Sequence, residues 1–118
     1  MRVGIDAREA FRSEPRGIGS YVQGVLRELP AVAPGDEFLL YHQLPRPAAL
    51  TLGPNLRPVR ADMPGGRFHL WERVQMPWRI RRDRLDVYHG TFNTLPPRWR
   101  AWRCARPDGS PGRAAKTW

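Results

Sequence analysis

The chain begins with a strand, a glycine loop and a helix, and this order limits the folds open to it. Val3 and Ile5 alternate in a short apolar run that stops at Asp6, which predicts a buried strand leaving a sheet. Gly17 and Gly19 follow, and the apolar-periodic segment after them predicts a helix. A helix N-terminus carries unpaired N–H groups and partial positive charge, so this arrangement can direct backbone amides at an anion.

The glycine pair has other interpretations. Both glycines could simply allow positive φ in a turn. The dinucleotide fingerprint G-x-G-x-x-G requires a third glycine, but Val22 occupies that position. The chain contains no G-x-x-x-x-G-K-[ST] motif, which excludes a P-loop. The loop is therefore a longer phosphate or ligand loop, or only a turn.

The helix after the loop has recognisable start and stop signals. Ser20 and Gln23 have the spacing of a capping box, and Pro30 is expected to end the helix. The predicted buried face consists of Tyr21, Val22, Val25, Leu26 and Leu29.

The remaining pattern continues the alternation of strands and helices. Residues 37–42 predict a strand covered on both faces, residues 56–60 a weak third strand, and residues 86–90 a short last strand. Residues 68–82 predict a helix interrupted or restarted at Pro77. The expected fold class is α/β, a Rossmann-like parallel sheet with flanking helices.

The helix at 68–82 carries an aromatic stripe followed by arginines. We interpret the stripe as core packing; it consists of Leu70, Trp71, Val74 and Trp78. The arginines that follow favour a solvated helix face, with contact to a membrane surface as the alternative.

Residues 97–118 differ in composition from residues 1–96. They contain five arginines, one lysine and one aspartate, a net charge of +5 out of +9 for the chain. No Leu, Ile, Val, Met or Phe follows Leu95, so this tail cannot offset its ordering entropy. We expect one partial domain over residues 1–96 and a disordered basic tail over residues 97–118.

Composition also bears on compartment and partners. A single cysteine, Cys104, excludes a disulfide framework, and no apolar run is long enough to span a membrane. We expect a cytoplasmic protein. The arginine excess is explained by GC-rich codon usage at least as well as by selected charge, so we do not expect nucleic acid as a partner.

Polar candidates follow the predicted strands. In open α/β sheets ligands bind beyond the carboxyl ends of the strands. Asp6, His42 and His89 fall there, and of the histidines we favour His89 for function. Other candidates follow His89 on its loop: Gly90, Thr91 and Asn93. We expect no metal site, because the three histidines and the cysteine lack ligand spacing.

Four segments of the first 96 residues carry a family resemblance. They are Met1-Arg-Val-Gly-Ile-Asp-Ala-Arg8, Gly17-Ile-Gly-Ser-Tyr21, Trp71-Glu-x-Val-x-Met-Pro77 and Asp86-Val-Tyr-His-Gly-Thr-Phe-Asn-x-Leu-Pro96. In this order they resemble the N-terminal domain of bacterial family-4-type (group 1) glycosyltransferases of the GT-B fold. Many of these enzymes build polysaccharides or glycolipids from nucleotide-activated mannose, glucose or similar sugars.

The resemblance implies a retaining hexosyltransferase with two Rossmann-like domains facing across a cleft. Its substrates would be a nucleotide-sugar and a glycan or lipid-linked acceptor, with no cofactor and no metal. The glycine loop, here Gly17, Gly19 and Ser20, would approach the donor diphosphate, and its amides would stabilise charge on the departing nucleotide. His89 matches the family histidine that contacts the donor sugar, so it is the catalytic candidate.

The family pattern stops after Pro96. We interpret the sequence as a truncated or frameshifted product without the C-terminal domain and its Glu-x7-Glu segment, and we expect this chain alone to be inactive. Two other classes stay open. One is a non-catalytic module that keeps a sugar or acceptor pocket. The other is a small basic nucleic-acid binder, whose affinity would fall steeply with salt.

Overall fold

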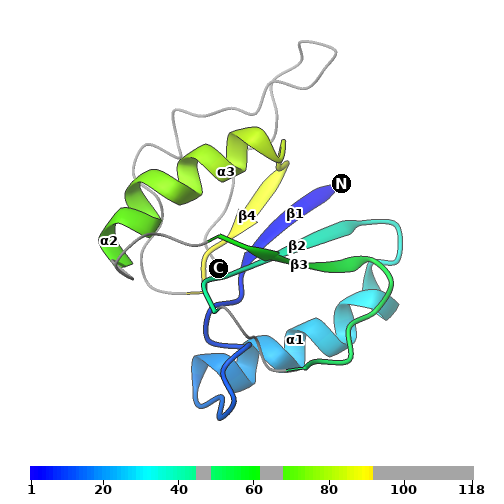
Figure 1. The fold of residues 1–118 in the computed structure, drawn as a ribbon. Helices are drawn as coiled ribbons and strands as arrows, with labels where there is room; N and C mark the ends of the chain where they lie inside the picture. Colours follow the sequence, from blue (N-terminus) through cyan, green and yellow to red (C-terminus); the bar gives the residue numbers. More distant parts are fainter. Residues whose placement is uncertain (45–48, 62–67, 92–118) are drawn as a thin grey trace.

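The computed structural model describes residues 1–44, 49–61 and 68–91 of the chain (Figure 1). The elements in order are β1 (Arg2–Asp6), α1 (Ile18–Val32), β2 (Glu37–His42), β3 (Leu56–Arg60), α2 (Phe68–Leu70), a π-helical segment η2 (Trp71–Gln75), α3 (Met76–Arg82) and β4 (Val87–His89). The expected α/β class is confirmed. The expected disordered tail at 97–118 and the domain boundary at 96 lie outside the described residues.

The four strands form one parallel sheet in the order β3-β2-β1-β4. β1 pairs with β2 through Ile5 opposite Leu40, and with β4 through Ile5 opposite His89. Because every pairing is parallel, the carboxyl ends of all four strands lie on one edge. From β1 the strand order runs one way through β2 and β3 and the other way to β4, so the β1–β4 boundary is the switch point where open α/β sheets bind ligands.

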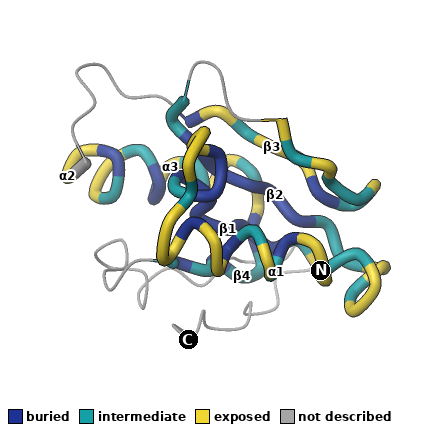
Figure 2. The backbone as a smooth tube through the Cα atoms, turned by 90° about the horizontal axis from the view of Figure 1, so that it is seen from below, coloured by how far each residue is buried: buried dark blue, intermediate teal, exposed yellow. Residues whose placement is uncertain are grey.

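Side chains alternate between the two faces of the sheet and so divide the core in two. On one face Val3, Ile5, Phe38 and Leu40 pack with residues of α1 such as Val22 and Leu26. On the other face Leu39, Tyr41 and Tyr88 pack with Trp71, Met76 and Ile80. Figure 1 shows α1 on one side of the sheet and the α2–α3 segment on the other. In Figure 2 the central strands are buried, whereas β3 is mostly exposed.

The start and end of α1 differ from the prediction. Gly17 precedes the first helical residue and accepts the amide of Tyr21 at 3.0 Å, so Ser20 lies inside the helix and forms no capping box. The Ser20 hydroxyl instead donates to the Pro15 carbonyl, and Gln23 donates to the Ala10 carbonyl. Pro30 does not end the helix, which continues to Val32. Two more helical residues, Ala31 and Val32, follow it, because a proline removes only its own N–H donor.

The predicted buried face of α1 is confirmed only in part. Val22 and Leu26 are buried, and Val25 and Leu29 are half-buried. Tyr21 is 60% exposed, so it does not belong to the core.

The aromatic stripe predicted for the second helix is also wrong in most positions. Only Trp71 is buried, whereas Leu70, Val74 and Trp78 are exposed. The cause is the π-helical segment Trp71–Gln75, in which hydrogen bonds span five residues rather than four. The wider turn brings Met76 and then Ile80 onto the buried face and leaves Val74 and Trp78 outside.

Gly19 is required by close packing, and this leads to a stability prediction. A Cβ on Gly19 would meet the Glu9 carbonyl oxygen at 2.6 Å, a backbone atom held by the loop before α1. Gly19→Ala is therefore expected to lower the free energy of unfolding by about 1–3 kcal/mol. Gly24→Ala is the matched control, because a Cβ there meets open space and alanine favours the helix by about 0.5–1 kcal/mol. Denaturant unfolding of both variants measures the difference, and equal effects would contradict it.

Candidate functional site

The candidate site lies at the carboxyl edge, where β1 and β4 end side by side. Asp6 is the last residue of β1, and His89 is the last residue of β4. The Thr91 hydroxyl donates to the backbone carbonyl of Asp6 at 3.0 Å, which ties the loop after β4 to the end of β1. The structure therefore brings together Asp6, His89, Gly90 and Thr91. Asn93 lies outside the described residues.

The Asp6 carboxylate is held in a buried ion pair with Arg8. Arg8 donates through Nε at 2.9 Å and through Nη2 at 2.6 Å, and the side chains are only 3% and 8% exposed for Asp6 and Arg8. The Arg8 guanidinium also lies 3.9 Å from the centre of the Trp71 ring. Asp6 is thus engaged in fixing the turn after β1, and its carboxylate is not a free ligand group.

Arg8 is the residue of this site that sequence reasoning missed. A charged residue two positions after a strand end reads as a solvated loop residue, yet Arg8 is 7% exposed. The Asp6-x-Arg8 spacing could have indicated this pair, because a carboxylate and a guanidinium so close in sequence can form a bidentate ion pair.

His89 is half-buried at the end of β4. Burial lowers the pKa of its imidazole, and the nearby charge of Asp6 acts in the opposite direction. A lowered pKa keeps the ring neutral at pH 7, with one nitrogen donating and the other accepting hydrogen bonds. Such a ring can bind a hydroxyl group without carrying a charge. Gly90, the next residue along the chain, is buried, and it has no side chain that would fill the space beside His89.

The glycine loop connects the carboxyl end of β1 to the start of α1. Gly17 has φ +50° with open space where a Cβ would be, so its conformation is the reason for glycine there. Gly19 packs on Glu9, and its amide already donates to the Arg16 carbonyl at 3.0 Å. Both observations favour the turn and packing interpretation for the glycines. Because parallel strands end on one edge of the sheet, we expect the Gly17–Gly19 loop and His89 to face one cleft, and this stays a prediction.

His42, the histidine we favoured less, is a core residue. It is 4% exposed, and its ring lies 4.9 Å from the ring of Phe11. Burial lowers the pKa of His42, and its Nδ1 has no hydrogen-bond partner within the described ranges. This environment is that of a packed neutral ring rather than of a ligand group.

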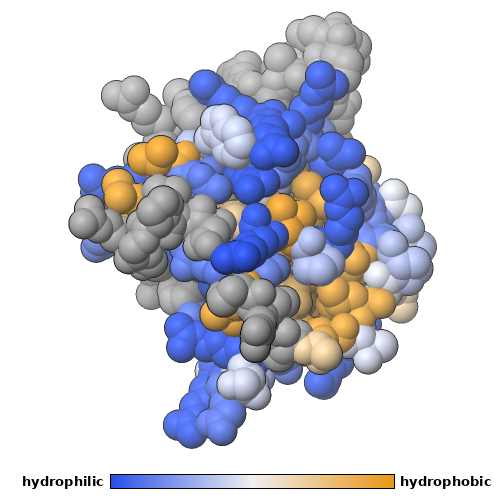
Figure 3. Space-filling view, in the orientation of Figure 1, coloured by the Kyte–Doolittle hydropathy of each residue, from blue (hydrophilic) through white to orange (hydrophobic). Residues whose placement is uncertain are grey.

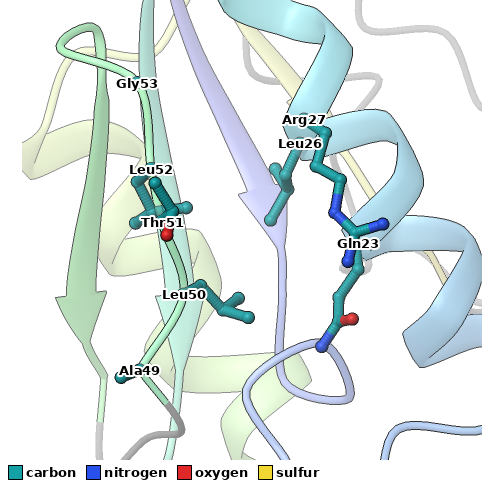
Figure 4. Close-up of a pocket in the computed structure, with 8 residues that line it drawn as sticks. All are labelled: Gln23, Leu26, Arg27, Ala49, Leu50, Thr51, Leu52 and Gly53. Atoms are coloured by element: carbon teal, nitrogen blue, oxygen red, sulfur yellow. The ribbon is translucent and has the colours of Figure 1, made fainter.

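A hollow in the surface lies between α1 and the segment before β3. Its volume is about 440 Å³, and Figure 4 shows Leu26 of α1 facing Leu50 across it, with Gln23 and Arg27 on the helix side. Figure 3 shows apolar side chains gathered in this region of the surface, which faces the viewer. None of the residues predicted for the site lines this hollow.

The described ranges contain no group of three or more His, Cys, Asp and Glu residues that could hold a metal ion. No helix in the same ranges has the length and apolar character needed to cross a membrane.

Comparison with known proteins identifies no relative of this chain. No family model, no curated protein and no solved structure matches it. The features that bear on function are therefore the sheet edge described above and the four sequence segments.

Proposed function

We propose that this chain contains part of the acceptor-side domain of a retaining glycosyltransferase. The observation that carries the proposal is the position of His89 at the β1–β4 switch point, at the carboxyl edge of a parallel sheet. This is where open α/β sheets bind ligands. The four segments that resemble family-4-type glycosyltransferases include this histidine and the glycine loop.

In the proposed reaction a hexose of the mannose or glucose type passes from a nucleotide-sugar to a glycan or lipid-linked acceptor. The neutral His89 imidazole hydrogen-bonds a hydroxyl of the donor sugar and orients it. Gly90 lets the sugar approach the backbone, and Thr91 holds the loop through its bond to the Asp6 carbonyl. The Gly19 amide is bonded to the Arg16 carbonyl, so it is the partial positive charge at the start of α1 that stabilises the charge developing as the nucleotide leaves. The proposal requires no metal and places the protein in the cytoplasm.

Binding tests this proposal on the 118-residue protein itself. Titration with UDP-glucose and GDP-mannose, followed by amide NMR, is expected to shift Gly90, Thr91 and the residues of the glycine loop. Gly24 and Gly53 serve as internal controls, because they lie away from the carboxyl ends of β1 and β4. His89→Ala is expected to remove the shift of Thr91. Shifts confined to other surfaces, or none at millimolar ligand, would contradict the proposed site.

We also propose that the α2–α3 segment contacts an anionic membrane surface, as a lipid-linked acceptor would require. Leu70, Val74 and Trp78 are 38%, 56% and 51% exposed and follow one another at four-residue spacing. The Trp78 ring has the guanidinium groups of Arg79 and Arg82 at 5.3 Å and 5.0 Å from its centre. Exposed apolar and aromatic side chains bordered by arginine suit the interface of an anionic bilayer.

The membrane contact predicts a loss of vesicle binding. Val74→Ser combined with Trp78→Ala is expected to weaken sedimentation with phosphatidylglycerol-containing vesicles at least tenfold, because both exposed apolar groups are removed. Tyr21→Ala is the matched control, since Tyr21 is 60% exposed but lies on α1 at the other face of the sheet. Equal binding by the wild type, the double variant and the control would exclude this surface.

A further inference from the structure

A second cavity, lined mainly by charged residues, lies on the α3 face of the sheet, apart from the carboxyl edge. Its volume is about 210 Å³, and its lining residues are Arg2, Glu37, Leu39, Arg57, Val59, Arg79, Arg82 and Asp83. Arg2 and Glu37 are the first residues of β1 and β2, so the cavity reaches toward the amino edge of the sheet. Neither His89 nor the glycine loop takes part in it.

Both carboxylates of the cavity already have partners. Glu37 accepts a bond from Arg2 Nε at 2.8 Å. Asp83 accepts the Tyr41 hydroxyl at 2.7 Å through its carboxylate, and accepts Arg2 Nη1 at 2.8 Å through its backbone carbonyl. Arg2 is therefore neutralised by Glu37 and acts as a wall of the cavity.

The other three arginines provide unneutralised donors. No carboxylate of the described residues forms an ion pair with Arg57, Arg79 or Arg82. Arg79 Nε is buried and has no hydrogen-bond partner there, and its Nη2 donates only at 3.3 Å, to the Arg60 carbonyl. A buried donor without an acceptor costs free energy, so an acceptor in the cavity would be stabilising.

We propose that this cavity binds a phosphate group through Arg57, Arg79 and Arg82. Guanidinium groups present paired N–H donors that match the oxygens of phosphate, and the stacking of Arg79 and Arg82 on Trp78 restrains two of them. A water molecule occupies about 30 Å³ of liquid. The cavity therefore has room for a phosphate group or a small phosphate ester, but not for an entire nucleotide-sugar.

The test is a titration of the 118-residue protein with inorganic phosphate, with sodium chloride keeping the ionic strength constant. The side-chain Nε–H resonance of Arg79 is expected to shift and saturate. The double variant Arg57→Gln/Arg82→Gln is expected to lose at least tenfold in affinity; both residues are exposed, so the fold should be unchanged. Arg27→Gln is the matched control, because Arg27 is an exposed arginine on the opposite face.

The outcomes distinguish specific binding of phosphate in this cavity from nonspecific attraction of anions to a basic protein. Phosphate affinity that is equal in wild type, double variant and control would overturn the proposal, as would an equal response to chloride alone. Arg57→Lys keeps the charge but not the paired donors, so an intermediate affinity supports the geometry. Glycerol phosphate and vesicles containing phosphatidic acid distinguish a soluble ester from a lipid headgroup, and loss of either interaction in the double variant supports the site.

Discussion

Asp6→Ala is expected to lower the free energy of unfolding by about 3–5 kcal/mol, a large part of the 5–15 kcal/mol typical of a domain. The substitution leaves the Arg8 guanidinium, whose side chain is 8% exposed, without its carboxylate. Removing one partner of a buried pair is costly because the remaining charge stays desolvated. Urea unfolding followed by circular dichroism measures the loss.

The chain supplies a matched control for this prediction. Arg12 and Glu9 form an ion pair at 2.8 Å with side chains 60% and 27% exposed, so Glu9→Ala is expected to cost about 0–1 kcal/mol. The double variant Asp6→Asn/Arg8→Met removes both charges and is expected to recover part of the stability. If Asp6→Ala costs no more than Glu9→Ala, the pair does not hold the turn after β1.

The sheet could be predicted from the sequence because its signals are local. The run Phe38–Tyr41 is apolar and bounded by turn residues, and all four strands formed where they were expected. The carboxyl-edge positions of Asp6 and His89 then follow from parallel pairing alone. For the same reason the position of the candidate site could be predicted from the sequence, but its chemistry could not.

The helices were harder because their buried faces depend on backbone details. A regular 3.6-residue period puts Val74 and Trp78 beside Trp71, but the π-helical segment rotates them to solvent. Ser20 has the spacing of a cap, yet the helix begins two residues earlier. Which polar groups are engaged could not be predicted either, because the Asp6–Arg8 pair depends on the turn after β1.

Under the proposed function, sugar transfer depends on two domains that face each other across a cleft. Residues 1–96, placed in a characterised full-length transferase of this class in exchange for its matching segment, are expected to transfer hexose, whereas the 118-residue polypeptide alone is not. Holding two substrates in position can lower the activation free energy by about 7–11 kcal/mol, and a protein that forms only one side of the cleft loses most of this effect. Enclosure by the second domain also excludes water from the reacting groups.

His89 is the residue on which the proposed function depends most, and turnover of this two-domain protein tests its role most directly. His89→Ala is expected to lower kcat about 100-fold with an unchanged unfolding midpoint, as for loss of one aligned hydrogen bond in an active site. His89→Gln, which keeps a donor, should retain part of the rate, and Val32→Ala, 77% exposed at the end of α1, should retain all of it. Unchanged kcat in His89→Ala, or measurable transfer by the 118-residue polypeptide alone, would contradict this account.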